Sequence, residues 1–266
     1  MASGGAEPKT LCLPEMTWTD VRDAIREGFD TVVIAVGSTE QHGPHLPLSV
    51  DSLIGEAVAV RVAERLGNAL VAPTICVGVS PHHMSFAGTI TVPEDVLVDL
   101  VLAYCQSLAQ HGFIRIALLP SHSGNCAAVR RVVERASASL QNTRVVGFWD
   151  MMGYFQPWYL VGGGAGLSEA AIGPHAGEAE TSMVLALRPD LVRMKDAATG
   201  YVGDTEHARE EIYVRGHGVE SVAPSGVLGD PPKAVADRGR QYLDATADLF
   251  ARHFIAAFAD RPAATE

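Results

Sequence analysis

Short apolar runs of strand length alternate with longer segments of helical periodicity along the first 150 residues. Residues 31–36 and 114–119 are rich in Val, Ile, Ala and Leu, which is typical of strands buried on both faces. Residues 52–66, 93–110 and 126–140 carry apolar side chains at helical spacing. Strands that alternate with helices in this way predict βαβ crossovers and a mainly parallel sheet. We therefore expect an α/β fold.

The remaining segments extend the same pattern. We predict further strands over residues 69–72, 88–92 and 144–149, and further helices over residues 17–27, 178–187 and 234–258. The first of these helices has Thr17 and Asp20 at capping-box spacing. Residues 150–177 are rich in glycine and predict irregular structure, with Gly162–Gly164 as a candidate mobile cover or a plain flexible loop. No repeat, linker or shift in composition divides the chain, so we expect one domain over residues 1–266.

The composition excludes several classes of protein. The chain has 266 residues, of which 47% are hydrophobic and 19% charged, and its formal net charge is −11. This acidity and the absence of a Lys/Arg cluster argue against nucleic-acid binding. The apolar runs are too short to span a membrane, and MASGGAEPKT does not resemble a signal peptide. The four cysteines show no CxxC spacing and predict reduced thiols, so we expect a cytoplasmic protein.

The first predicted strand is followed by GSTEQHGPHLPLSVD, residues 37–51, which concentrates metal-binding side chains. Glu40 and His42 are two residues apart, so their side chains lie on one side of an extended segment. Asp51 begins the next helix, where its carboxylate can cap that helix and also face the loop. His45, beside Pro44, is more simply a loop residue.

Two further polar clusters follow predicted elements. His122 lies in LLPSHSGN after a buried strand, and GPHAGEAETS places His175, Glu178 and Glu180 at the start of a helix. Ligands of parallel sheets bind beyond the carboxyl ends of the strands, where the first two clusters fall. Each cluster has an ordinary alternative: His122 can be a satisfied buried histidine, and the two glutamates can complement the helix dipole. Their convergence favours a site for divalent cations such as Zn²⁺, Mn²⁺ or Fe²⁺.

The motifs VGSTEQHGPHLPLSVD, FAGTIT, HAGEAETSMVLALRPDLV and SGVLGDPPKA resemble the creatininase, or creatinine amidohydrolase, family. The similarity runs from about residue 30 to residue 240. It implies a three-layer α/β/α sandwich with two divalent metal ions in each subunit, and a homo-oligomer, often a hexamer. It also implies hydrolysis of a C–N bond: opening of a lactam-type ring, deformylation, or removal of a terminal dipeptide from a precursor peptide.

The resemblance also assigns roles to individual residues. The implied metal ligands, with Asp51 as the bridging one, are Glu40, His42, Asp51, His122 and Glu178. His175 matches a histidine that acts in proton transfer to the leaving nitrogen, and Glu178 belongs with it to the catalytic set. We expect His83, Ser123 and Trp149 to contact the substrate.

The chain also departs from the family pattern. Pro120, Ser121 and Ser123 replace the Asn and two Gly residues that usually surround the histidine matching His122. Creatininase carries a glutamate ligand two residues after that histidine, whereas this chain has Gly124. Ala171 and Pro174 replace a tryptophan and an acid that precede the histidine matching His175. These departures argue against creatinine itself as the substrate.

Three functional hypotheses follow. The first is a metal-dependent amidohydrolase that acts on an amide, lactam or formamide bond of a small molecule through a metal-bridging hydroxide. The second is a peptidase or maturation enzyme of a biosynthetic pathway, which requires an open cleft rather than a closed pocket. The third is an inactive family member that serves as a binding protein.

Overall fold

A computed structural model describes residues 8–260 of the chain, and its centre is a four-stranded parallel sheet. The strand order is β2-β1-β3-β4. The strands span Thr31–Val36 (β1), Ala69–Val71 (β2), Arg115–Pro120 (β3) and Arg144–Gly147 (β4). Thr31 is in register with Arg115, and Arg115 with Arg144, so the carboxyl ends of these strands lie at one edge. The predicted α/β fold with a parallel sheet is confirmed.

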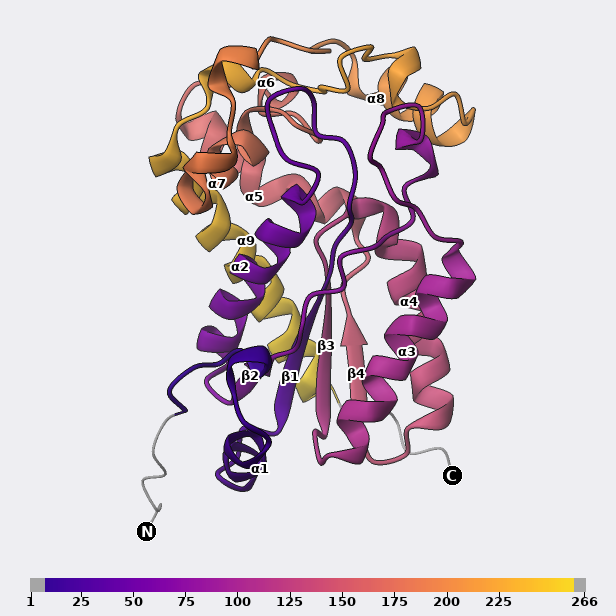
Figure 1. Cartoon of the computed structure of the whole chain (residues 1–266), viewed down its shortest axis with the longest axis vertical. Coiled ribbons are helices and arrows are strands. Elements are labelled where there is room, and N and C mark those ends of the chain that lie inside the picture. Colours follow the sequence, from indigo (N-terminus) through magenta and orange to yellow (C-terminus); the bar gives the residue numbers. More distant parts are fainter. Residues whose placement is uncertain (1–7, 261–266) are drawn as a thin grey trace.

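Helices cover both faces of the sheet (Figure 1). On one side lie α2 (Val50–Leu66) and α9 (Ala236–Ala259), and on the other lie α3 (Glu94–Gln110) and α4 (Cys126–Ser139). The remaining α-helices are α1 (Trp18–Arg26), α5 (Met151–Gly164), α6 (Glu169–Ile172), α7 (Glu178–Leu187) and α8 (Thr205–Arg209). Figure 1 shows α5 to α8 near the end of the molecule that lies beyond the carboxyl ends of the strands. The result is the expected three-layer sandwich.

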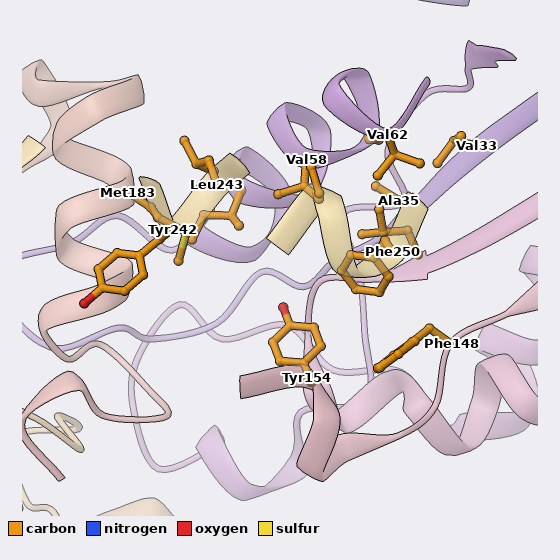
Figure 2. Packing of buried hydrophobic residues seen from close by; sticks show 14 of the residues in the cluster. Val33, Ala35, Val58, Val62, Phe148, Tyr154, Met183, Tyr242, Leu243 and Phe250 are labelled. Atoms are coloured by element: carbon orange, nitrogen blue, oxygen red, sulfur yellow. The ribbon is translucent and has the colours of Figure 1, made fainter. Parts of the chain in front are cut away.

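The alternation of side chains along β1 explains the two layers of helices. Val33 and Ala35 face a core formed with α2, α5, α7 and α9, part of which Figure 2 shows. Val32 and Ile34 face the second core, formed mainly with α3 and α4. Because successive strand residues point to opposite faces, the apolar run from Val32 to Val36 must be covered on both faces.

Two segments differ from the sequence-based expectation. Residues 88–92 form isolated bridges from Ile90 and Thr91 rather than a strand. Residues 151–164 form α5, although Pro157 and four glycines lower the helical propensity of this segment. Gly162 packs closely against Ile172 and Tyr242, so a glycine is needed there for close packing rather than for a mobile cover.

The capping box predicted for the first helix is present, with Thr17 and Asp20 bonded reciprocally. Within residues 8–260, no helix combines the length and apolarity that a bilayer crossing requires. Most of the N-terminal segment MASGGAEPKT lies outside the described residues.

Candidate metal centre

The acidic and imidazole side chains meet beyond the carboxyl ends of β1 and β3. Glu40 and His42 lie in the loop that follows β1, and Asp51 lies in the first turn of α2. His122 follows β3 directly. All four side chains are buried. The fold therefore assembles this site where parallel sheets commonly bind ligands.

One group of ligand atoms comprises Glu40, Asp51 and His122. Nδ1 of His122 lies 3.3 Å from Oε1 of Glu40 and 3.6 Å from Oδ2 of Asp51. Ser38 donates a hydrogen bond to the other Glu40 oxygen, which fixes the orientation of that carboxylate.

A second group adjoins it on the other side of Asp51. Nε2 of His42 lies 3.6 Å from Oδ1 of Asp51 and 3.7 Å from Oε2 of Glu180. The two oxygens of Asp51 thus face different imidazoles. This placement suits a carboxylate that bridges two cations.

Backbone carbonyls behind the two imidazoles determine which nitrogens face the carboxylates. The carbonyl of Glu40 lies 3.2 Å from Nδ1 of His42, and that of Val79 lies 3.2 Å from Nε2 of His122. Because a carbonyl only accepts hydrogen bonds, each of these nitrogens carries the proton. In the neutral form of each ring, which is the form that binds a metal, Nε2 of His42 and Nδ1 of His122 direct lone pairs toward the acids.

The acids and imidazoles of the cluster shift one another's pKa values strongly, because they are buried together. Although burial alone lowers the pKa of His42, Glu180 and Asp51 raise it to about 10. Burial also opposes the shift of His122, whose pKa Glu40 and Asp51 raise to about 9. Burial raises the pKa of Asp51, with a contribution from Glu40, and raises that of Glu180 to about 7. A cation between these groups is therefore favoured, whether it is a proton or a metal ion.

The residues fit a divalent metal centre. Among the described residues, Nε2 of His42 and Oδ2 of Asp51 are buried without a hydrogen-bond partner. A buried polar atom without a partner is costly unless a ligand satisfies it. A set of imidazole and carboxylate donors suits Zn²⁺ or Mn²⁺. The residues that the structure brings together at ligand spacing are Glu40, His42, Asp51, His122 and Glu180, with His83 and His175 beside them.

The structure does not bring Glu178, which we expected as a ligand, to the cluster. The Glu178 carboxylate is fully buried and accepts hydrogen bonds from Arg238, Tyr242 and Ser182. It therefore joins α7 to α9 instead of facing the other acids. The carboxylate that does face them belongs to Glu180, which also accepts a hydrogen bond from the backbone N–H of Ala176.

Two further histidines lie against Glu40. Nε2 of His83 is 3.3 Å from Oε1 of Glu40, and Nδ1 of His175 is 3.9 Å from the same oxygen. Burial lowers the pKa of His83 to about 3, and burial next to His42 lowers that of His175 well below its usual value. Both rings are therefore neutral at physiological pH. The residue behind both of them is Gln41, which the sequence interpretation overlooked.

A family model described as "Creatinine amidohydrolase" matches residues 14–254. The chain belongs to the creatininase family. It is 35% identical over 231 residues to a "Mycofactocin precursor peptide peptidase" of Mycobacterium ulcerans, covering 84% of each chain. It is 33% identical over 202 residues to a creatinine amidohydrolase of Pseudomonas putida, covering 69% of this chain and 74% of that one.

Solved creatininase structures have the same fold. One, described as the Mn form, superposes with a TM-score of 0.78 at 25% identity and covers 95% of this chain and 100% of its own. A mutant described as Zn-Zn type gives a TM-score of 0.77 at 26% identity with the same coverage. These likenesses confirm the predicted family and sandwich fold, and the chain is a creatininase-family hydrolase.

In this member of the family, the acid and imidazole cluster opens into an apolar cleft. The inner cavity encloses about 320 Å³ and includes Glu40, Asp51, His122 and Glu180 in its wall. The outer cleft, about 880 Å³ with the space that is open to solvent included, has an apolar lining that comes largely from α5 and from residues 201–213. Five residues line both: Ser123, Phe155, Pro174, His175 and Tyr213.

These positions bear on the expected substrate contacts. Ser123 and His175 lie at the junction of the two cavities, and His83 lines the inner one. Trp149 lines neither cavity and is 43% exposed just before α5. The structure thus does not bring Trp149 to the site. Tyr213, from the π-helix Glu210–Val214, was missed because it lies in a segment without a recognisable motif.

Proposed function

We propose that this chain is a metal-dependent peptidase that hydrolyses a C–N bond of a peptide substrate at the Glu40–Asp51 cluster. The observation that carries the proposal is the apolar cleft that continues outward from the buried cluster, with walls from α5 and from residues 201–213. Apolar walls that extend beyond the proposed ligands offer contacts to the peptide residues that flank the scissile bond. The relative from Mycobacterium ulcerans, named for its action on the mycofactocin precursor peptide, supports the same conclusion.

The proposed ligands divide between two cations that share Asp51. Glu40 and His122 would hold one ion, and His42 and Glu180 the other. Divalent cations bound there would polarise the scissile carbonyl and lower the pKa of a water molecule towards ~7. One carboxylate oxygen of Asp51 faces His42 and the other faces His122, so Asp51 would contact both cations.

The remaining side chains handle the substrate and its protons. His175 lies at the junction of the two cavities, where its ring N–H can donate a hydrogen bond to the substrate, and the proton that the departing nitrogen gains comes from the attacking water. Hydrolysis breaks the C–N bond, adds hydroxyl to the carbonyl carbon and leaves a protonated amine. The outer cleft holds the adjoining apolar residues of the peptide, and its walls, including Met151, Tyr159 and Ile212, supply the contact.

The test uses the purified chain, synthetic mycofactocin precursor peptide and added Zn²⁺ or Mn²⁺, with mass spectrometry of the products. We expect cleavage that chelation abolishes and either metal restores. Glu40→Gln and Asp51→Asn should lose bound metal and turnover together. Asp244→Asn is the control, because Asp244 is an exposed acid of α9 that pairs with Arg61.

Three results would contradict the proposal in different ways. Hydrolysis of creatinine with no cleavage of the peptide would favour a small-molecule amidohydrolase. Full peptide turnover after chelation would refute the metal-dependent mechanism. Less than about one metal ion per chain, together with inactivity toward both substrates, would favour a binding protein.

A further inference from the structure

Gln41, the middle residue of the EQH motif, lies behind His83 and His175. Its Nε2 atom is 2.8 Å from Nδ1 of His83 and 2.9 Å from Nε2 of His175. The Gln41 side chain is buried, and the opposite nitrogens of the two rings face Glu40. One amide group therefore contacts both of the neutral histidines.

Two backbone groups of known polarity fix the orientation of the amide. The N–H of Gly43 donates to Oε1 of Gln41 at 2.9 Å, and the carbonyl of Gly226 accepts from Nε2 at 3.2 Å. Rotating the amide by 180° would place the NH₂ group against an N–H and the oxygen against a carbonyl. The NH₂ group therefore points toward the two imidazoles.

The amide in turn fixes the tautomers of both rings. Because an NH₂ group only donates, Nδ1 of His83 and Nε2 of His175, which have the two shorter contacts, must accept and carry no proton. The longer contact to the Gly226 carbonyl shares one of the two hydrogens. A neutral imidazole has one N–H, so His83 is protonated on Nε2 and His175 on Nδ1. Both N–H groups then point toward Glu40.

This arrangement is the reverse of that at His42 and His122. Carbonyls stand behind those two rings, so their lone pairs face the acids. An amide donor stands behind His83 and His175, so their N–H groups face inward. A nitrogen that carries a proton is no metal ligand, although by spacing alone Glu40, His83 and His175 form a third candidate cluster.

We propose that Gln41 is a positioning residue that holds His83 and His175 as hydrogen-bond donors and so excludes them from metal ligation. The proposal rests on the proposed function only for the use of these donors: the inward N–H of His175 can donate a hydrogen bond to the substrate, and that of His83 orients Glu40. The assignment of the tautomers rests on hydrogen-bond geometry alone.

Gly226 keeps the amide in place. Its φ is +78°, and a Cβ atom there would collide with the Gln41 side chain. Gly226→Ala therefore displaces Gln41 without changing any group of the cluster. Gly67→Ala is a matched control, since Gly67 has a φ of +75° and no atom within 4 Å of the added Cβ.

The decisive measurement is the ¹⁵N spectrum of the histidine rings in metal-free protein at pH 7.5, with signals assigned by their loss in His83→Gln and His175→Gln. We expect the proton on Nε2 of His83 and on Nδ1 of His175. In Gln41→Glu, which keeps the size of the side chain but only accepts, we expect at least one ring to protonate the nitrogen facing residue 41. Wild-type rings protonated on the opposite nitrogens, or tautomers unchanged in Gln41→Glu, would overturn the proposal.

Kinetics supply the second readout. We expect Gln41→Glu and Gly226→Ala to lower kcat for the peptide at least tenfold and to change KM less than twofold, while Gly67→Ala keeps the wild-type kcat. A wild-type kcat in Gln41→Glu, or equal losses in both glycine variants, would refute a positioning role. Failure of the wild type to cleave peptide would refute the proposed function and leave the NMR result standing.

Discussion

Nε2 of His42 lies 3.7 Å from Oε2 of Glu180, and both side chains are almost completely buried. The pair joins the loop after β1 to the first turn of α7, two segments far apart in the sequence. Asp51 lies 3.6 Å from the same imidazole nitrogen. The carboxylates of Asp51 and Glu180 thus flank one nitrogen of His42, and this combination of ligands suits a divalent cation.

The contact between His42 and Glu180 predicts that Glu180→Gln and Glu178→Gln differ in their effects on metal binding and stability. Glu180→Gln should lower metal affinity at least about tenfold and abolish peptide turnover, because it removes a ligand. Glu178→Gln should retain the metal but lose about 3 kcal/mol of stability, because it breaks a buried pair with Arg238. Metal analysis and urea unfolding measure both effects. Metal loss in Glu178→Gln at unchanged stability would restore the original assignment.

The sequence alone could not distinguish these two residues. Side chains two positions apart in a helix differ in direction by about 200°, so only one of them can face the metal cluster. Which one does depends on Arg238 and Tyr242 of α9, which hold Glu178 on the opposite side. No local pattern contains that information.

Other features were predictable because their causes are local. The apolar run of β1, the capping box of α1 and the clustering of Glu40, Asp51 and His122 beyond parallel strands follow from periodicity and topology. Gln41 was missed because its role depends on Gly226, whose carbonyl reaches it from a distant loop. The helix α5 was missed because burial of Tyr154 and Trp158 outweighs the low propensity of its glycines.

Tyr213 should control access of a peptide to the cluster. It lines both cavities, and its ring lies 4.9 Å from that of His82. We expect Tyr213→Ala to raise KM for the peptide about tenfold, equivalent to ~1.4 kcal/mol of lost contact, and Tyr213→Phe to have little effect. Val214→Ala is the control, because Val214 belongs to the same π-helix but lines neither cavity. Equal KM changes in the alanine variants at 213 and 214 would contradict this role.

The four cysteines should differ in reactivity. Cys76 is exposed, whereas Cys105 of α3 and Cys126 of α4 are buried, and burial raises the pKa of each buried thiol to about 12. At pH 8 only about one in ten thousand of such thiols is ionised, and the thiolate is the reactive form. We expect iodoacetamide to modify Cys76 in the native protein and to reach Cys105 and Cys126 only in urea, as peptide mass spectrometry would show. Equal native rates at Cys76 and Cys105 would contradict the packing of α3 and α4.

Asn125 joins three segments that carry the site. Its fully buried amide donates to the carbonyls of Val36 and Gly37 and accepts from the N–H of Val79. These contacts tie the end of β1, which leads to Glu40, to the turn that contains His122. The side chain therefore sets the distance between two proposed ligands as well as satisfying three backbone groups.

Removing this amide should cost stability and metal binding together. Asn125→Ala removes the side-chain partner of the Gly37 carbonyl and of the Val79 N–H, while the Val36 carbonyl still accepts from the N–H of Ser121, and we expect a loss of about 3 kcal/mol. At neutral pH, Asn125→Asp should be no more stable than Asn125→Ala, because its carboxylate would face the carbonyls of Val36 and Gly37. Urea unfolding and zinc titration measure the two effects, with Asn142→Ala as the control because Asn142 is exposed before β4. A stability loss in Asn125→Ala no larger than that in Asn142→Ala would show that Asn125 does not hold these segments together.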